Sequence, residues 1–331
     1  MPKMINNPQR VVDEMLHGFY KCHSDRIAKT RHPRVFVRRG RKSRTPRVGI
    51  VSGGGTGHLP AFIGYVRKGM IDAVAIGNLF EAPSAEVFLE AIRQADQGEG
   101  VLCIHGNYPL DNRCVGEAVR LARLEGIRVE HVCANDDVAT IAEDGDRSAS
   151  RGLAGEVLLW KIAGAASMAG KSLEEITDLC RRANLNTRSI GVAFAACIRP
   201  EVGVPNFEVV EGTMEFGIGH HGDPGLSSYK MRPANEIADL IMEKLLAVYP
   251  EGEEASVTVM VSGLGATTQM ELYILYNRIA DILKARGIRT SQSFVGNYFT
   301  SLDMQGVSVT LMKMDEELER LVAVDAESLL G

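Results

Sequence analysis

Three glycine-containing segments of the sequence carry side chains able to do chemistry. They are residues 52–58 (SGGGTGH), 105–112 (HGNYPLDN) and 215–225 (EFGIGHHGDPG). Imidazoles and carboxylates transfer protons near neutral pH, and an imidazole can also act as a nucleophile. Glycines beside them let a ligand approach the backbone closely. The segments therefore indicate acid–base or nucleophilic chemistry on a bound ligand.

Segment 215–225 contains the adjacent histidines His220 and His221, followed by Asp-Pro-Gly. A zinc site needs three or four ligands. Adjacent side chains point in different directions, and no H-x-x-x-H pattern or nearby cysteine completes a set, so a metal site is disfavoured. Two interpretations stay open on the pattern alone. One is a turn built by Asp-Pro-Gly with incidental histidines, and the other is a histidine presented for attack on a carbonyl carbon.

Segment 52–58 follows an apolar strand expected over 48–52 and ends in His58. We expect a helix over 60–70 after it, whose N-terminus would favour anionic or strongly polar oxygens. The spacing is not that of a P-loop, and no lysine follows the glycines. A dinucleotide site lacks its acidic ribose partner, because the next expected strand ends in Asn78. The glycines form either a structural turn or a ligand-binding loop.

Segment 105–112 follows another apolar strand and contains Asp111. One interpretation makes Asp111 the N-cap of the helix expected over 112–126, which is the commoner use of such a residue. The other places its carboxylate at the same sheet edge as His58, where the pair would exchange a proton with a substrate hydroxyl. The spacing leaves both open.

The elements around these segments alternate regularly. Apolar strands are expected over 48–52, 72–77, 100–106 and 128–134, separated by amphipathic helices over 60–70, 84–96 and 112–126. This pattern predicts a parallel sheet covered on both faces, with ligands at the carboxyl ends of its strands. Two further helices are expected near 153–169 and 172–185, and the second opens with a capping box of Ser172 and Glu175.

A different pattern begins near residue 187. Strands are expected over 189–197, 207–210, 214–219, 256–263, 290–298 and 307–313, with helices over 234–249 and 269–287. Consecutive strands without helices between them predict a mixed sheet. We therefore predict two α/β domains. Residues 1–186 form a doubly wound parallel sheet with three α/β/α layers, and residues 187–331 form a two-layer α/β domain with a mixed sheet.

The composition is that of a soluble globular protein, with 331 residues, 45% of them apolar, and a net charge of −5. This charge argues against a nucleic-acid or anionic-membrane partner. The longest apolar run is about nine residues, too short to span a membrane, and the first residues lack a signal-peptide core. None of the six cysteines forms a C-x-x-C pair. We expect a reduced, cytoplasmic protein.

Several long motifs resemble those of the substrate-binding subunit of dihydroxyacetone kinases. They are VSGGGTGHLPAF, NYPLDN, CANDDVA, RGLAGEVLLWKIAGAAS, EFGIGHHGDPG, VSGLGATTQMELYILY and VGNYFTSLDMQG, and the resemblance runs along the whole chain. It implies that His221 forms a covalent hemiaminal with the ketone of the substrate. It also implies that Gly54 and Gly55 lie against the substrate, that His58 is a hydrogen-bonding or acid–base partner, and that Asp111 accepts the hydroxyl proton during phosphorylation.

The resemblance also implies what this chain does not hold. No nucleotide-binding motif or D-x-D-x-G cluster for Mg²⁺ is present in the sequence. In the family, ATP or ADP with Mg²⁺ is bound by a separate helical subunit or a fused domain. The resemblance therefore implies a chain without a bound cofactor that forms a homodimer and is active only with that partner. The phosphoryl donor is either ATP or a phosphohistidine relay.

Three departures from the family's motifs concern the substrate. Leu59 stands where the family has glutamate, Pro109-Leu110 replaces Thr-Gly, and His220 replaces an aliphatic residue. We expect a changed pocket, and a longer ketose such as erythrulose is one alternative to dihydroxyacetone. A second alternative is a ligand-sensing coactivator of a transcription regulator, which some family members resemble. The presence of His58, Asp111 and His221 together favours catalysis.

Overall fold

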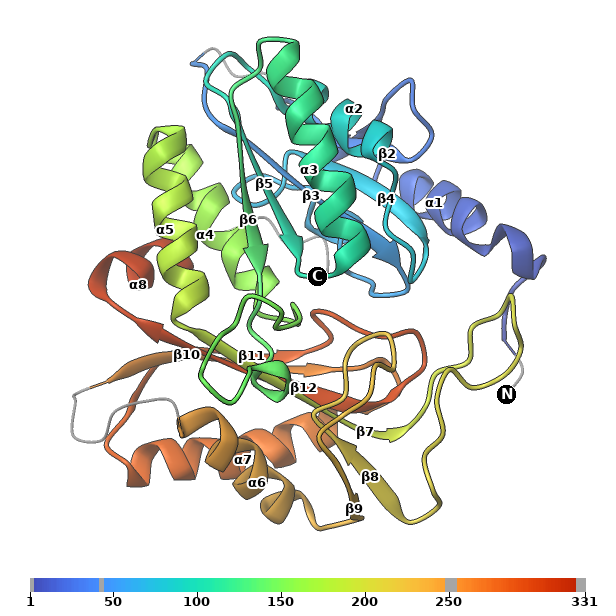
Figure 1. Cartoon of the computed structure of the whole chain (residues 1–331), viewed down its shortest axis with the longest axis vertical. Helices are drawn as coiled ribbons and strands as arrows, with labels where there is room; N and C mark the ends of the chain where they lie inside the picture. Colours follow the sequence, from blue (N-terminus) through green and yellow to red (C-terminus); the bar gives the residue numbers. More distant parts are fainter. Residues whose placement is uncertain (1–2, 42–44, 248–254, 326–331) are drawn as a thin grey trace.

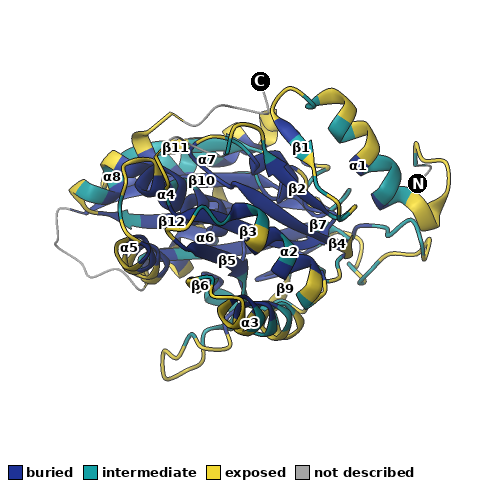
Figure 2. Ribbon diagram, turned by 90° about the horizontal axis from the view of Figure 1, so that it is seen from above, coloured by how far each residue is buried: buried dark blue, intermediate teal, exposed yellow. Residues whose placement is uncertain are grey.

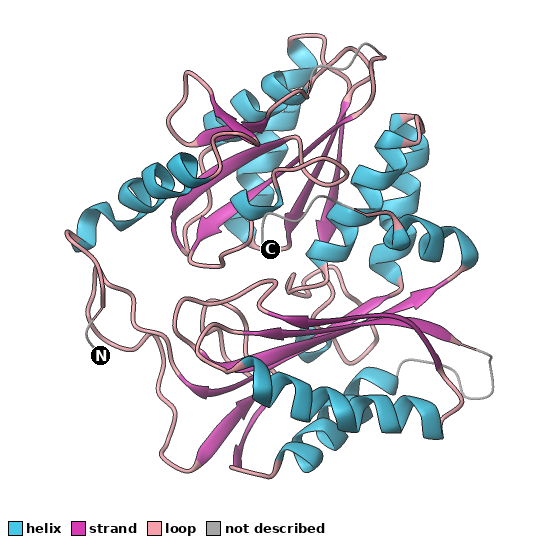
Figure 3. Cartoon of the chain, turned by 180° about the vertical axis from the view of Figure 1, so that it is seen from behind, coloured by secondary structure: helices cyan, strands magenta, loops and turns pink. Residues whose placement is uncertain are grey.

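The computed structural model describes residues 3–41, 45–247 and 255–325. Within these ranges the chain forms two six-stranded sheets, one above the other in Figure 1, with helices around and between them. The parallel strands of the first sheet point toward the second sheet, and loops meet in the space where they end (Figure 3).

The first sheet has the strand order β1-β2-β4-β3-β5-β6. The bounds are β1 Ile27–Lys29, β2 Val35–Arg38, β3 Gly49–Thr56, β4 Ala73–Leu79, β5 Val101–Gly106 and β6 Val129–Ala134. Strands β3 to β6 are parallel, as predicted, whereas β1 and β2 are antiparallel additions that the sequence analysis missed.

Helices cover both faces of this sheet. The helices α2 (Ala85–Ala95) and α3 (Pro109–Leu124) pack on one face. The opposite face carries α1 (Val11–Cys22), α4 (Glu156–Met168) and α5 (Leu173–Leu185). The predicted three-layer α/β/α arrangement is confirmed. The capping box at the start of α5 is also present, with both Ser172 and Glu175 hydrogen bonds formed.

The second sheet is mixed, as predicted, with the strand order β11-β10-β12-β7-β8-β9. Its strands are β7 Thr187–Ala195, β8 Thr213–Phe216, β9 Ser227–Lys230, β10 Ser256–Gly263, β11 Arg289–Gly296 and β12 Gln305–Met314. β10 and β11 are parallel, and the other neighbours are antiparallel. The helices α6 (Ala234–Leu246) and α7 (Gln269–Ala285) cover one face, and α8 (Glu316–Ala323) packs on the other.

Helix α4 joins the two sheets into one core. Eleven of its thirteen residues are buried, because it is apolar around almost its whole circumference. One hydrophobic cluster contains Ile50 of the first sheet, Trp160 of α4, and Met260 and Met312 of the second sheet. Packing between the sheets is therefore continuous through α4.

The helix predicted over 60–70 is wrong. β3 instead continues through the three glycines to Thr56, and only a 3-10 turn, Ile63–Tyr65, follows. Residues 60–66 are buried on every side, so this apolar stretch inserts into the core and offers no polar face for an amphipathic helix. The helix N-terminus expected to face a ligand after His58 is consequently absent from this segment.

Three smaller predictions differ from the structure. Residues 207–210 form no strand, and the analysis missed β9 and α8. The helix expected over 234–249 ends at Leu246, and residues 248 and 249 lie outside the described ranges. Figure 2 shows the buried strands at the centre and the exposed residues on the outer helices and loops. None of the described helices is both long and apolar enough to cross a membrane.

Candidate functional site

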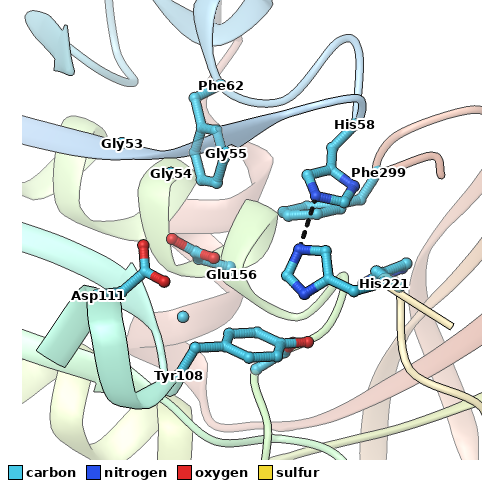
Figure 4. A pocket seen from close by; sticks show the side chains of 13 residues that line it. Gly53, Gly54, Gly55, His58, Phe62, Tyr108, Asp111, Glu156, His221 and Phe299 are labelled. Atoms are coloured by element: carbon cyan, nitrogen blue, oxygen red, sulfur yellow. Dashed lines mark hydrogen bonds between the residues drawn. The ribbon is translucent and has the colours of Figure 1, made fainter. Parts of the chain in front are cut away.

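The carboxyl ends of β3 and β5 and the loop after β8 enclose a pocket of about 350 Å³, part of it open to solvent. Its lining consists of Gly53, Gly54, Gly55, His58, Phe62, Gly106, Tyr108, Asp111, Gly152, Glu156, His220, His221 and Phe299. The structure thus brings together all five residues predicted for the site, and ten of the lining residues are labelled in Figure 4.

The glycines of β3 are required by close packing against the protein itself. A Cβ atom on Gly54 would collide with the ring of Phe62. A Cβ atom on Gly55 would lie 2.6 Å from the backbone nitrogen of Glu81 and 2.9 Å from backbone atoms of Phe80. Both glycines nevertheless line the pocket, so their backbone forms its wall.

His58 is held by a hydrogen bond to the second sheet's side of the pocket. Its Nδ1 lies 2.7 Å from the carbonyl oxygen of Thr300, and its ring stacks on Phe80 at 5.1 Å. A carbonyl oxygen only accepts, so Nδ1 carries the hydrogen and Nε2 of the neutral ring has a free lone pair. Burial, with His221 close by, lowers the pKa of His58 to about 3. His58 is therefore neutral at physiological pH.

His221 faces His58 directly. The two Nε2 atoms are 3.0 Å apart, and this contact is the dashed line in Figure 4. Burial, together with the nearby cations of Arg151 and Arg199, lowers the pKa of His221 to about 4. Its Nδ1 lies 3.9 Å from Oδ2 of Asp223. Two neutral rings can keep this contact only if one proton lies between their Nε2 atoms.

The loop that carries His221 is fixed from two sides. Gly222, next in the chain, has φ of +80°, and the Nδ2 of Asn206 donates to the carbonyl oxygen of His221 at 2.8 Å. From the first sheet's side, the guanidinium of Arg151 donates to the carbonyl oxygens of Gly217 at 2.8 Å and Pro224 at 3.2 Å. These bonds hold the imidazole in position over the pocket.

Arg151 is itself held by a buried ion pair with Asp137, at 2.7 Å. Asp137 also accepts from the backbone N–H of Ala139 at 2.9 Å. The neighbouring Asp136 accepts from the backbone N–H groups of Leu153 and Gly155, which shapes the turn into α4. Asp136 and Asp137 of the motif CANDDVA thus position the segment RGLAGE. Arg151 of that segment in turn holds the loop that carries His221.

Asp111 lies in the first turn of α3, across the pocket from His58 and His221 (Figure 4). Its interpretation as an N-cap is wrong, because α3 begins at Pro109 and the N-cap is Tyr108. Proline is favoured at the first helical position, so it starts the helix earlier than expected. Burial raises the pKa of Asp111 to about 7. At neutral pH this carboxyl group can both accept and donate a proton.

The sequence analysis missed Glu156, the first residue of α4. It is fully buried between Asp111 and His58 at the back of the pocket (Figure 4), and the hydroxyl of Ser52 donates to its Oε1 at 3.4 Å. Burial raises its pKa well above the usual range, and the nearby Asp136 and Asp111 raise it further. Glu156 is therefore a neutral acid able to donate a hydrogen bond. A single acid opening an otherwise apolar helix was the signal that pointed to it.

His220 also lines the pocket, so this departure from the family's motifs does lie at the site. It is 3% exposed, and its ring stacks on Phe299 with centroids 4.7 Å apart. By contrast, Leu59 does not line this pocket. It is 38% exposed and lines a separate groove.

No three His, Cys, Asp or Glu side chains of the described ranges are placed to hold a metal ion together. The arrangement is instead one of two facing imidazoles on one side of a small pocket and a carboxyl group with a near-neutral pKa on the other. Such a site can add a nucleophile to a ligand and move protons to and from its hydroxyl groups.

The chain is similar in sequence to known proteins. Residues 17–329 match the Dak1 domain. The chain is 39% identical over 96% of its length to the dihydroxyacetone-binding subunit DhaK of PTS-dependent dihydroxyacetone kinase 1 from Listeria innocua, and the match covers 95% of that subunit. It is 38% identical over 99% of its length to the D-erythrulose kinase of Mycolicibacterium smegmatis, of which it covers 56%.

A solved structure is also similar. The dihydroxyacetone kinase operon co-activator DhaQ superposes with a TM-score of 0.88 at 33% identity, over 96% of this chain and 97% of that one. The similarity to the family therefore holds for sequence and for structure along nearly the whole chain. This chain belongs to the Dak1 domain family.

Proposed function

We propose that this chain is the substrate-binding subunit of a kinase for dihydroxyacetone or a closely related short ketose. The observation that carries the proposal is the pair of facing imidazoles, His58 and His221, opposite Asp111 in one buried pocket. The similarity to a dihydroxyacetone-binding subunit over 96% of the chain supports the same substrate class.

In the proposed binding step, His221 adds to the ketone carbon. In the free pocket His221 donates its Nε2–H to His58, whereas in the reacting tautomer the proton is on Nδ1, toward Asp223, which frees the Nε2 lone pair for attack. A C–N bond forms, the π bond of the carbonyl breaks, and the imidazole proton ends on the former carbonyl oxygen. No other reagent is consumed. Because His221 is neutral at physiological pH, its lone pair is available.

The covalent bond selects the substrate and orients it. A polyol without a carbonyl group, such as glycerol, cannot form it. The bound ketose extends one terminal hydroxyl toward Asp111, whose carboxylate accepts the hydroxyl proton as the oxygen attacks phosphorus. One P–O bond forms, the bond to the leaving group breaks, and the proton remains on Asp111. Fixing the hydroxyl in this way contributes through orientation.

The phosphoryl donor would be held by a separate helical subunit, as ATP or as ADP in a relay, with Mg²⁺. No lysine or arginine is among the described residues that line the pocket, so the pocket itself does not suit a polyphosphate. This supports a chain that binds the ketose and is active only with its partner. We expect this chain to be a homodimer that acts in the cytoplasm.

Nuclear magnetic resonance with a ketose labelled at its carbonyl carbon tests the proposal. With wild-type protein, the labelled carbon should move from the carbonyl region to that of a carbon with four single bonds. His221→Ala should abolish this shift. A shift that persists in His221→Ala would refute the role of His221, and glycerol serves as the ligand that should not bind.

A second candidate function is that of a ligand-sensing coactivator, favoured by the TM-score of 0.88 to the DhaQ co-activator. A sensor needs the covalent anchor but not the acid–base groups. Turnover separates the two functions. The chain mixed with a helical nucleotide-binding subunit and its donor should phosphorylate the ketose if it is a kinase subunit, whereas a coactivator would bind the ketose without turnover.

A further inference from the structure

His220 is a buried polar side chain without a partner in the pocket wall. Both ring nitrogens are shielded from solvent and form no hydrogen bond with any residue that the structure describes, although the ring itself lines the pocket. Buried polar groups are nearly always hydrogen-bonded, and an unpaired one is destabilising. An aliphatic side chain would pack against Phe299 at lower cost. The imidazole therefore needs an explanation beyond packing.

The ring is fixed in place without using its nitrogens. It stacks on Phe299 at an interplanar angle of 21°, and the hydroxyl of Ser301 donates to the backbone carbonyl oxygen of His220. Burial lowers the pKa of His220 well below its usual range, and the neighbouring His58 and His221 lower it further. The ring is therefore neutral, with one N–H donor and one lone-pair acceptor. That pair of groups matches a hydroxyl, which can donate and accept at once.

The position of His220 indicates which part of a ketose it would meet. Its ring lies 6.0 Å from that of His58, edge to face, and it directly precedes His221 in the loop. Asp111 lies across the pocket from His58 and His221 (Figure 4). If the carbonyl carbon is held by His221 and one arm of the ketose extends to Asp111, the other arm extends toward the side of His58 and His220.

We propose that His220 is a specificity-determining residue that hydrogen-bonds a hydroxyl on this second arm. The second arm of dihydroxyacetone is a single hydroxymethyl group. A four-carbon ketose of the erythrulose class has one more hydroxyl-bearing carbon there and so offers His220 an additional partner. The pocket thus prefers the longer ketose. This inference rests on the proposed function and names the substrate class of the same site.

The test compares two substrates in four proteins. The kinase is reconstituted with its helical nucleotide-binding subunit, and kcat/KM is measured for erythrulose and for dihydroxyacetone. Wild type should favour erythrulose, and His220→Ile should lower the erythrulose-to-dihydroxyacetone ratio by roughly 3- to 10-fold, as loss of one neutral hydrogen bond implies. His220→Gln, which keeps a donor and an acceptor, should restore part of the ratio. Leu59→Ala, in the separate groove, is the matched control and should leave the ratio unchanged.

The outcomes separate this inference from the proposed function. A shift of the labelled carbonyl carbon in wild type, together with equal ratios in wild type, His220→Ile and His220→Gln, overturns the role of His220 and leaves the proposed function standing. These equal ratios are expected if the ring nitrogens of His220 bind only water. Absence of the shift with both ketoses overturns both proposals. Should His220→Ile fold poorly by thermal denaturation, His220→Leu gives the same comparison.

Discussion

Replacing Arg151 by alanine should destabilise the protein in a pH-dependent way. The side chains of Arg151 and Asp137 are 11% and 0% exposed, and removing one partner of such a buried pair costs about 3–5 kcal/mol of unfolding free energy. Burial raises the pKa of Asp137 to about 6, although the Arg151 cation lowers it. Without Arg151 that pKa rises further, so the carboxyl group of the variant stays protonated at neutral pH.

The pH dependence follows from this difference in proton binding. Below pH 6 Asp137 is protonated in both proteins, so the difference between their unfolding free energies changes little with pH. Above pH 6 the wild-type carboxyl group ionises and the variant's does not. The deficit of the variant therefore grows with pH, by up to about 2.3 kcal/mol between pH 6 and pH 8, because the wild-type carboxyl group is only half ionised at pH 6.

Urea unfolding measures this difference through the fluorescence of Trp160, the single tryptophan, which is fully buried. Arg93→Ala is the matched control, because Arg93 pairs with Glu125 on the exposed surface. Its effect should be small and independent of pH. If the loss caused by Arg151→Ala is the same at pH 6 and pH 8, the buried ion pair is not the source of its stabilisation. Arg151→Ala should also weaken ketose binding, since the loop that carries His221 loses two hydrogen bonds.

Three further predictions concern the pocket. Asp111→Asn should keep the ketose adduct but lower kcat by roughly 10²–10⁴-fold, and wild-type kcat should rise with pH through about 7 as Asp111 ionises; a flat pH profile would contradict its role as the base. Glu156→Gln should gain stability relative to wild type as pH rises above about 4.5, because the raised pKa of Glu156 means that the folded state holds a proton which the unfolded state releases. If the variant and wild type differ in unfolding free energy by the same amount at pH 5 and pH 8, Glu156 is ionised in the folded state. Gly54→Ala should cost about 1–3 kcal/mol, because its Cβ atom collides with the Phe62 ring, and should lower ketose affinity as the wall shifts; unchanged affinity and unfolding midpoint would show that the wall yields freely.

The sequence predicted the parallel strands β3 to β6 well, because apolar runs separated by amphipathic helices have few alternative arrangements. It failed over 60–70, where apolar residues at roughly helical spacing are buried on all sides by partners far along the chain. It also missed β1 and β2, because they have only three and four residues and β1 is the edge strand of the sheet. Local pattern cannot show which tertiary contacts a short segment will find.

Several residues that line the site could be predicted from the sequence, but the residues that hold them in position could not. His58, Asp111 and His221 stood out because their types and glycine neighbours indicate chemistry. Arg151 did not, since nothing in its local sequence shows that its guanidinium reaches the loop around His221. Likewise the pKa values of Asp111 and Glu156 depend on how deeply they are buried, which is a property of the fold.

The continuous packing through α4 restricts how the site can open. Swinging one sheet away from the other would separate the side chains of Trp160, Met260 and Met312 and expose apolar surface to water. Such a hinge motion costs more than a local shift of the loop that carries His221. Under the proposed function, ketose entry and product release would therefore depend on this loop, while the packing through α4 holds the two sheets together as one frame.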